Sequence, residues 1–141
     1  MKLLIDECIG KNIYGEIKTF LDSSVPPIQH MHMLDFNGRQ GLNDEEWVPK
    51  AAAEGWFVIT GDSGRSRLGA PLHLLLPQYK ISAIFFSGKL QSKPGLDKVR
   101  AILSVLPRLE TLATKPPGTR WKLYLTINGY GIKEWPRQPE R

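Results

Sequence analysis

Acidic residues stand at three places where a catalytic site can form. Asp6 and Glu7 directly follow a short apolar run, Asp44–Glu46 open a polar segment, and Asp62 follows a second apolar run. Carboxylates that gather without a lysine or arginine between them repel one another, and a divalent cation holds such a group together. Hard oxygen ligands select Mg²⁺ or Mn²⁺ over softer metals. Such a site hydrolyses phosphodiesters, because the metal lowers the pKa of a bound water and neutralises charge on the leaving oxygen.

A serine lies beside one of these acids, since residues 58–65 read VITGDSGR. A nucleophilic Ser63 needs a histidine base and a buried aspartate arranged around it, and no such base is apparent in the sequence. The Gly-x-Ser-x-Gly pattern of hydrolase nucleophile elbows does not occur either. We therefore assign the chemistry to Asp62 rather than to Ser63.

Basic residues accompany the acidic ones. The whole chain has 19 Lys and Arg against 14 Asp and Glu, a formal net charge of +5 and a pI near 9.4. This balance favours a polyanionic partner such as RNA, with a Lys/Arg-rich surface on an ordinary soluble protein as the alternative. The residues best placed to guide a nucleic-acid backbone into the site are Lys11, Arg39, Arg65 and Arg67.

Apolar runs with strand character alternate with amphipathic helical segments along the chain. We expect strands at residues 3–5, 28–34, 56–60, 81–86 and 119–127. We expect helices at residues 9–21, 43–55, 70–78 and 93–112, and a loop at 35–41. This order predicts an α/β fold, a three-layer α/β/α sandwich with a mainly parallel central sheet.

Ligands of such sheets bind beyond the carboxyl ends of the strands. If the first and third strands are neighbours, Asp6 and Asp62 meet at one edge of the sheet. The helix that begins near Asp44 can bring a third carboxylate to the same edge.

Local signals set the expected boundaries. Asn43 is a good N-cap and Glu46, three residues later, completes an approximate capping box. Pro49 predicts a kink or a late helix start, and Pro107 predicts a bend. We expect one domain over residues 1–130 and a loosely ordered tail over residues 131–141.

Each acid also has an ordinary structural explanation. The acids at 44–46 complement the dipole of a helix N-terminus, and Asp62 suits a turn. Asp6 is harder to explain this way, because aspartate is disfavoured in strands.

At these residues the sequence resembles the PIN-like ribonucleases, and among them the branch of short toxin-like proteins of the VapC type. The opening LLIDE is similar to the first strand and Asp-Glu pair of that branch. The segments NDEEW and AAAEGWFVITGD resemble its central helix, strand and acidic residue. The likeness covers residues 1 to about 65 well and the remainder only in the order of its elements.

The resemblance implies a metal-dependent endoribonuclease, many relatives being toxins that a small antitoxin holds inactive. Carried over by position, the Mg²⁺ or Mn²⁺ ligands would be Asp6, an acid of the run 44–46 taken as Asp44, and Asp62. The supporting residues would be the acids Glu7 and Glu45 and the hydroxyls of Thr60 and Ser63.

Two positions depart from the family pattern. Many relatives have asparagine where this chain has Cys8, and many have a further acid where Ser63 and Gly64 stand. The thinner acidic shell supports an alternative, a degenerate PIN-like module that binds RNA or a protein. A metal hydrolase of small phosphoesters is a third hypothesis.

Other residues carry weaker signals. His30 and His32 would share one face of a strand, a spacing found in zinc sites, but no third ligand is apparent. Trp121 and Trp135 are candidates for stacking on bases.

Cys8 is the sole cysteine, which excludes an internal disulfide and fits a reducing cytosol. With no signal-peptide core and no long apolar run, we expect a cytoplasmic protein without a membrane partner. The expected partners are the RNA substrate and a cognate antitoxin protein, and a homodimer is a further expectation.

Overall fold

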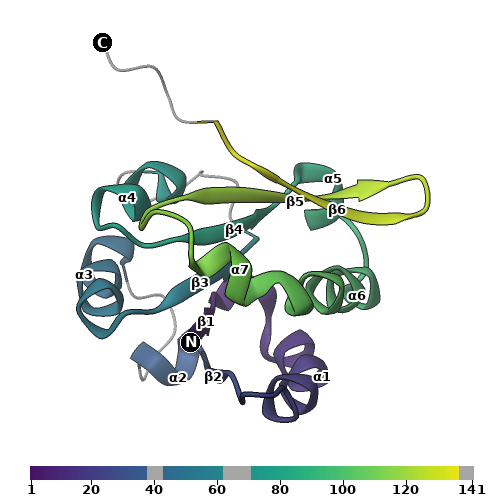
Figure 1. The fold of residues 1–141 in the computed structure, drawn as a ribbon, viewed down its shortest axis with the longest axis horizontal. Coiled ribbons are helices and arrows are strands. Elements are labelled where there is room, and N and C mark those ends of the chain that lie inside the picture. Colours follow the sequence, from purple (N-terminus) through teal and green to yellow (C-terminus); the bar gives the residue numbers. More distant parts are fainter. Residues whose placement is uncertain (38–42, 62–70, 137–141) are drawn as a thin grey trace.

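A six-stranded sheet forms the centre of the computed structural model, which describes residues 1–37, 43–61 and 71–136 (Figure 1). Its strands lie in the order β2-β1-β3-β4-β5-β6. Their bounds are Lys2–Ile5 (β1), Gln29–His32 (β2), Phe57–Thr60 (β3), Ala83–Phe86 (β4), Arg120–Thr126 (β5) and Gly129–Glu134 (β6). The first five strands run parallel, and β6 is antiparallel to β5.

The three central strands are covered on both faces. All four residues of β3 and of β4 are buried, as are the last three of β1. Parallel strands buried on both faces are continuous apolar runs, which is why LLI, FVIT and AIFF carry no alternating polar positions except Thr60. The functional residues must therefore lie at the ends of these strands rather than along them.

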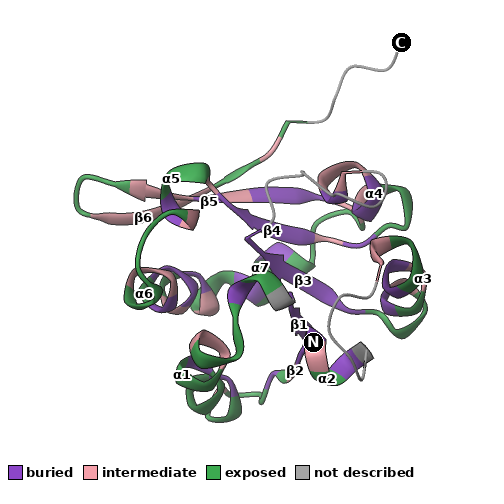
Figure 2. Ribbon diagram, turned by 180° about the vertical axis from the view of Figure 1, so that it is seen from behind, coloured by how far each residue is buried: buried purple, intermediate pink, exposed green. Residues whose placement is uncertain are grey.

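Helices cover both faces of the sheet (Figures 1 and 2). One face packs against α1 (Lys11–Asp22), α6 (Gly95–Val105) and α7 (Leu109–Ala113), and also against α5 (Gly88–Gln91). The other face packs against α2 (Met33–Asn37), α3 (Asp44–Glu54) and α4 (Leu72–Gln78). The expected three-layer α/β/α sandwich with a mainly parallel sheet is confirmed. Among the described residues, no helix combines the length and apolar character needed to cross a membrane.

Several boundaries differ from the sequence expectation. The second strand ends at His32, and Met33–Asn37 form the short helix α2 instead of strand and loop, because Met33 and Phe36 turn inward to pack in the core. Helix α3 begins at Asp44 and runs through Pro49, so the late start is wrong. Pro49 is the sixth residue of this helix, so α3 gives up the hydrogen bond that an N–H at this position would donate to the carbonyl of Glu45. The predicted bend at Pro107 is a 3₁₀ turn, Leu106–Arg108, between α6 and α7.

The tail expected from residue 131 is wrong for residues 131–134, which form most of β6. Ile127 and Asn128 form the turn between β5 and β6, and Gly129 begins β6 opposite Thr126. The dipeptide Asn128-Gly129 is a strong hairpin signal in a sequence. Pairing with β6 covers the edge of β5, whose Trp121 and Leu123 are buried.

Candidate active site

The strands β1 and β3 are neighbours, which was the condition for Asp6 and Asp62 to meet at one edge of the sheet. Strands β1 and β3 pair in parallel with Ile5 opposite Ile59, which places Asp6 level with Thr60. The backbone N–H of Asp6 donates to the carbonyl of Ile59 at 3.0 Å and extends this pairing by one residue. The parallel pairing of β1 and β3 therefore continues to Asp6.

The Asp6 carboxylate is held by a hydroxyl from the adjacent strand. The Oγ1 atom of Thr60 donates to Oδ2 of Asp6 at 2.6 Å, and Thr60 is fully buried. Asp6 itself is only 6% exposed. Hydrogen bonds to a carboxylate are short and strong, so this contact fixes the orientation of the acid. Thr60 thus contacts the Asp6 carboxylate directly, and the supporting role expected for it at a metal site stays a prediction.

Cys8 completes the group around Asp6. Its thiol donates to Oδ2 of Asp6 at 3.3 Å, lies 3.3 Å from Oγ1 of Thr60, and accepts from the N–H of Gly61 at 3.2 Å. Cys8 is exposed as a residue, but these neighbours crowd its sulfur, and the surroundings of the sulfur decide its ionisation. Desolvation of the sulfur, followed by the negative charge of Asp6, raises the pKa of the Cys8 thiol. Cys8 is therefore a neutral hydrogen-bond donor and not a nucleophile.

Gln91, which the sequence did not single out, reaches the same strand end from α5. A Cβ placed on Gly61 would meet the side-chain amide of Gln91, so the glycine leaves room for this close approach. Oε1 of Gln91 is buried and has no hydrogen-bond partner in the described part of the chain. Helix α5 follows β4 directly and was not expected from the sequence, which is why the residue was missed.

The second acidic segment lies at the start of α3. The side chain of Asn43 accepts from the N–H of Glu45 at 2.9 Å and caps this helix. Oδ1 of Asp44 accepts from Nε1 of Trp47 at 2.9 Å, and Glu45 is exposed. Asp44 thus has a structural contact with a buried tryptophan in addition to the role expected for it.

The structure describes only part of the expected ligand set. Asp62, Ser63, Arg39, Arg65 and Arg67 lie outside the described residues, as does the side chain of Glu7. Over residues 1–37, 43–61 and 71–136, no three His, Cys, Asp or Glu side chains gather into a group that could hold a metal. Of the expected ligands, Asp6 is described at the end of β1 and Asp44 at the start of α3, and the roles expected for them stay predictions.

Lys11 and the histidine pair have specific contacts. Nζ of Lys11 lies 3.0 Å from Oδ1 of Asp35, and both side chains are about half exposed. The rings of His30 and His32 both pack against Tyr14, at 5.6 and 5.5 Å between centroids, which confirms that they share a face. His30 also contacts the Tyr14 hydroxyl at 2.6 Å and Oδ1 of Asp22 at 2.5 Å. This histidine is thus committed to contacts away from the strand end.

The chain was compared with known proteins. A family model described as a PIN-like domain matches residues 1–71. No curated protein and no solved structure matches the chain. The matched segment runs from β1 past the end of β3, and so contains Asp6, Glu7, Asp44–Glu46 and Asp62.

Proposed function

This chain belongs to the PIN-like domain family, and on that premise we propose that it is a metal-dependent endoribonuclease. PIN-like domains are commonly nucleases and depend on divalent metals. The finer proposal is that the protein is the toxin of a toxin–antitoxin pair, belongs to the toxin-like branch, and acts on RNA in the cytoplasm.

The observation that carries the proposal is the setting of Asp6. A buried carboxylate, level with Thr60 and fixed by its hydroxyl, lies at the carboxyl edge of two central parallel strands. Ligands of open α/β sheets bind at this edge. An acid kept rigid and largely out of water is suited to a role that requires a defined position of its oxygens.

The residues that would hold Mg²⁺ or Mn²⁺ are Asp6, Asp44 and Asp62, with Glu7 and Glu45 assisting. A bound cation of this kind activates water and neutralises charge on a phosphodiester. Thr60 orients the Asp6 carboxylate, and the neutral Cys8 thiol donates to the same oxygen without adding charge. Arg65 and Arg67, with Arg39 and Lys11, are proposed to contact phosphates.

Cleavage of labelled RNA by the purified full chain tests the proposal. Wild-type protein is expected to cut with Mg²⁺ or Mn²⁺ and to stop on addition of a chelator. Asp6→Asn and Asp62→Asn should each lower the rate by at least about 100-fold, whereas Glu16→Gln on α1, an exposed acid, should not. Cleavage by Asp62→Asn at the wild-type rate, unaffected by chelator, would overturn the assignment.

A second candidate function is a degenerate PIN-like module that binds RNA or a protein without cutting. The specific observation in its favour is Cys8, which fills the place beside Asp6 with a thiol whose pKa is raised by desolvation and by that acid. Mn²⁺ titration by calorimetry separates the two, since a module without a metal site shows no binding at millimolar metal.

The toxin role has its own test. Expression of the wild-type chain is expected to arrest growth of a bacterial host, and expression of Asp6→Asn is expected not to. Co-expression of a small protein encoded beside this chain should restore growth if that protein is the antitoxin.

A further inference from the structure

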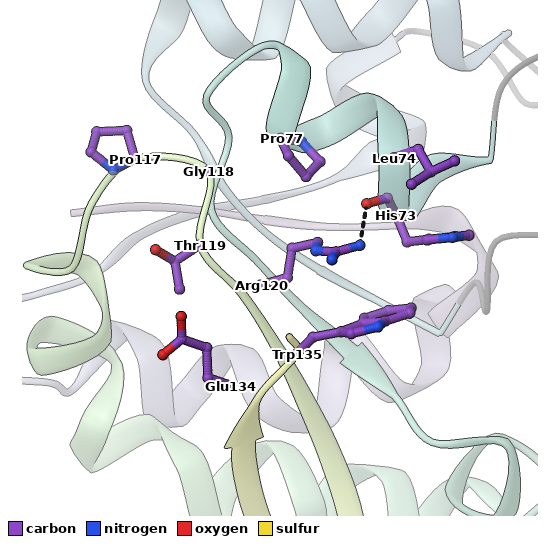
Figure 3. Close-up of a pocket in the computed structure, with 9 residues that line it drawn as sticks. All are labelled: His73, Leu74, Pro77, Pro117, Gly118, Thr119, Arg120, Glu134 and Trp135. Atoms are coloured by element: carbon purple, nitrogen blue, oxygen red, sulfur yellow. Dashed lines mark hydrogen bonds between the residues drawn. The ribbon is translucent and has the colours of Figure 1, made fainter. Parts of the chain in front are cut away.

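A group of cationic and aromatic side chains lies on the β5–β6 hairpin, remote in sequence from the acids. Arg120, 6% exposed, donates from its guanidinium to the carbonyls of His73 and Pro136, both at 2.8 Å. The Trp135 ring stacks on the His73 ring at 5.0 Å with an interplanar angle of 12° (Figure 3). Arg120 thereby ties the end of the hairpin to the start of α4.

Two further cations extend this group along the hairpin. Nζ of Lys122 lies 4.0 Å from the centre of the Trp135 ring, and Cζ of Arg120 lies 4.7 Å from it. Nζ of Lys133 lies 5.2 Å from the centre of the Tyr124 ring. We call Arg120, Lys122 and Lys133 the hairpin cation cluster. Its aromatic neighbours hold the cations through their ring faces.

No acid neutralises this cluster in the part of the chain that the structure describes. The ion pairs found there are Lys11–Asp35 and His30–Asp22, so no carboxylate lies within 4.0 Å of a cluster cation. The pKa of Lys122 is lowered by desolvation and then by the positive charges of Lys133 and Arg120.

Glu134, the nearest acid along β6, belongs to the other face of the hairpin. It pairs with Trp121 in the strand register, and in Figure 3 its carboxylate points toward Thr119 rather than Arg120. Both Glu134 and Arg120 line a pocket of about 280 Å³, together with His73 and Pro117. Among the described residues, the cluster is thus a group of cations with no carboxylate within 4.0 Å, and Arg120 lines this pocket.

The sheet register places the cluster on the same face as Asp6. Thr60 is opposite Phe85, Phe85 is opposite Lys122, and Lys122 is opposite Lys133. Directly opposite residues point to the same face, and Asp6 is level with Thr60 at the other end of this row. Three strand spacings separate Asp6 from Lys122, which is about 14 Å.

We propose that the hairpin cation cluster binds the phosphate backbone of single-stranded RNA as it leaves the Asp6 site. Lys122 and Lys133 make the phosphate contacts, because Arg120 is buried and its donors are engaged by carbonyls. Arg120 adds positive potential and holds Trp135 in place. The inference rests on the proposed function for its substrate, but its binding test does not require cleavage.

The aromatic side chains favour single-stranded RNA over an acidic protein as the occupant. Tyr124 lies across the backbone of Gly131, where a Cβ would be 2.6 Å from Cζ of the ring, and it is partly exposed. A basic groove interleaved with aromatic rings is the common form of single-strand binding surfaces, since any base can stack on a ring. An acidic protein would use the charges but not the exposed ring.

Fluorescence anisotropy with a labelled uridine RNA of about 12 nucleotides, in chelator to prevent cleavage, tests the inference. Lys122→Gln/Lys133→Gln should weaken binding on the order of tenfold and reduce the slope of log affinity against log salt by about 1.4, which is about 0.7 per lost phosphate contact. The matched control is Lys18→Gln/Lys93→Gln, which removes two exposed lysines associated with the helices on the opposite face. Lys122→Arg/Lys133→Arg should bind as the wild type does.

The outcomes separate this inference from the proposed function. Unchanged RNA affinity and salt slope in Lys122→Gln/Lys133→Gln overturn the inference, even if the wild type cleaves RNA. Weakened RNA binding in a chain that never cleaves supports it and favours the non-catalytic module. Lys133→Gln alone, at an exposed position, should show half of the slope change, which guards against misfolding of the double variant. Equal displacement of the RNA by polyglutamate and by unlabelled RNA of the same charge would assign the surface to an acidic protein instead.

Discussion

At the scale of single residues, the hydroxyl of Thr60 helps to hold the Asp6 carboxylate in its orientation by donating a hydrogen bond to it. A buried carboxylate needs compensation for lost hydration, and a short hydrogen bond from a neighbouring strand supplies part of it. The residue is the one polar position in an otherwise apolar strand. The hydrogen bond to Asp6 explains why this position is a threonine, whereas the packing of β3 by itself does not.

Replacing Thr60 with valine keeps the shape of the side chain and removes the hydroxyl. We expect Thr60→Val to lower the free energy of unfolding by about 1.5–3 kcal/mol, because a hydrogen bond to a charged group is lost. RNA cleavage should fall by at least about tenfold, since Asp6 loses its orientation. Urea unfolding and a cleavage assay measure the two effects, with Thr60→Ser as the control that keeps the hydroxyl. Equal cleavage by Thr60→Val and Thr60→Ser would contradict the role given to the hydroxyl.

Because of Cys8, we expect the free energy of unfolding to change with pH in the alkaline range. Desolvation of its sulfur, with the charge of Asp6, raises the pKa of the thiol in the folded state above its value in the unfolded chain. The unfolded chain therefore releases this proton first, and the free energy of unfolding should fall as pH rises above about 8.5.

The stability associated with the protonated Cys8 thiol is fully present below the pKa that this thiol has in the unfolded chain, and it is lost as pH rises beyond that value. Urea unfolding of the wild type and of Cys8→Ser between pH 7 and pH 10 isolates it, because the other titrating groups are common to both proteins. The wild type should lose stability more steeply than Cys8→Ser. Parallel curves would show that the thiol ionises equally in both states.

At the scale of elements, α5 packs closely against the end of β3 through Gln91 and Gly61. The Gln91 amide occupies the space that a Cβ at Gly61 would take, so a larger residue at this strand end would displace that amide. The N–H of Gly61 also donates to Cys8, so a shift at this point reaches the group around Asp6. Helix α5 therefore takes part in positioning the candidate active site, although it has only four residues.

Gly61→Ala should destabilise the protein by about 1 kcal/mol, the low end of the usual cost of overpacking, since the new methyl group displaces the flexible Gln91 amide. Gly61→Ala/Gln91→Ala should recover most of this loss, because the second change removes the atoms that clash. A double-mutant cycle of unfolding free energies is expected to give a coupling of about 0.5–1 kcal/mol. Additive losses would mean that the two residues do not compete for space.

At the scale of the whole molecule, the two halves of the sheet have different surroundings. The strands β2, β1, β3 and β4 lie between helical layers, whereas the turn end of the β5–β6 hairpin extends beyond them (Figure 1). The family match ends at residue 71, before the hairpin begins. The acidic edge thus belongs to the shared domain, and the hairpin cation cluster lies in the part of this chain beyond the match.

Metal binding should stabilise the whole fold if the acids form a site. A cation that binds only the folded state raises the free energy of unfolding by about 2.7 kcal/mol at 100 times its Kd. We expect Mn²⁺ to raise the Tm of the wild type, and chelator to reverse the rise. Asp6→Asn should lose the response, and Glu110→Gln, an exposed acid on α7, should keep it. A Tm rise of the same size in Asp6→Asn would place the bound metal elsewhere.

Much of the architecture could be predicted from the sequence, because its signals are local. Continuous apolar runs marked the central strands, helical periodicity marked α1 and α6, and Asn43 and Gly55 marked the ends of α3. The α/β class and the position of Asp6 after the first strand follow from that alternation alone. The strand β6 was also signalled by Asn128-Gly129, but the prolines and charges that follow it suggested a tail.

Only the tertiary structure decided which distant residues meet. No local pattern links Thr60 and Cys8 to Asp6, because their contacts depend on β1 and β3 being parallel neighbours in one particular register. Gln91 meets Gly61 because α5 turns back after β4, and Lys122 shares the face of Asp6 because three strand pairings align. The sequence by itself determined the chemical groups and the elements that carry them. The register of the sheet determined their distances, because hydrogen-bonded strand pairing couples residues far apart in the chain.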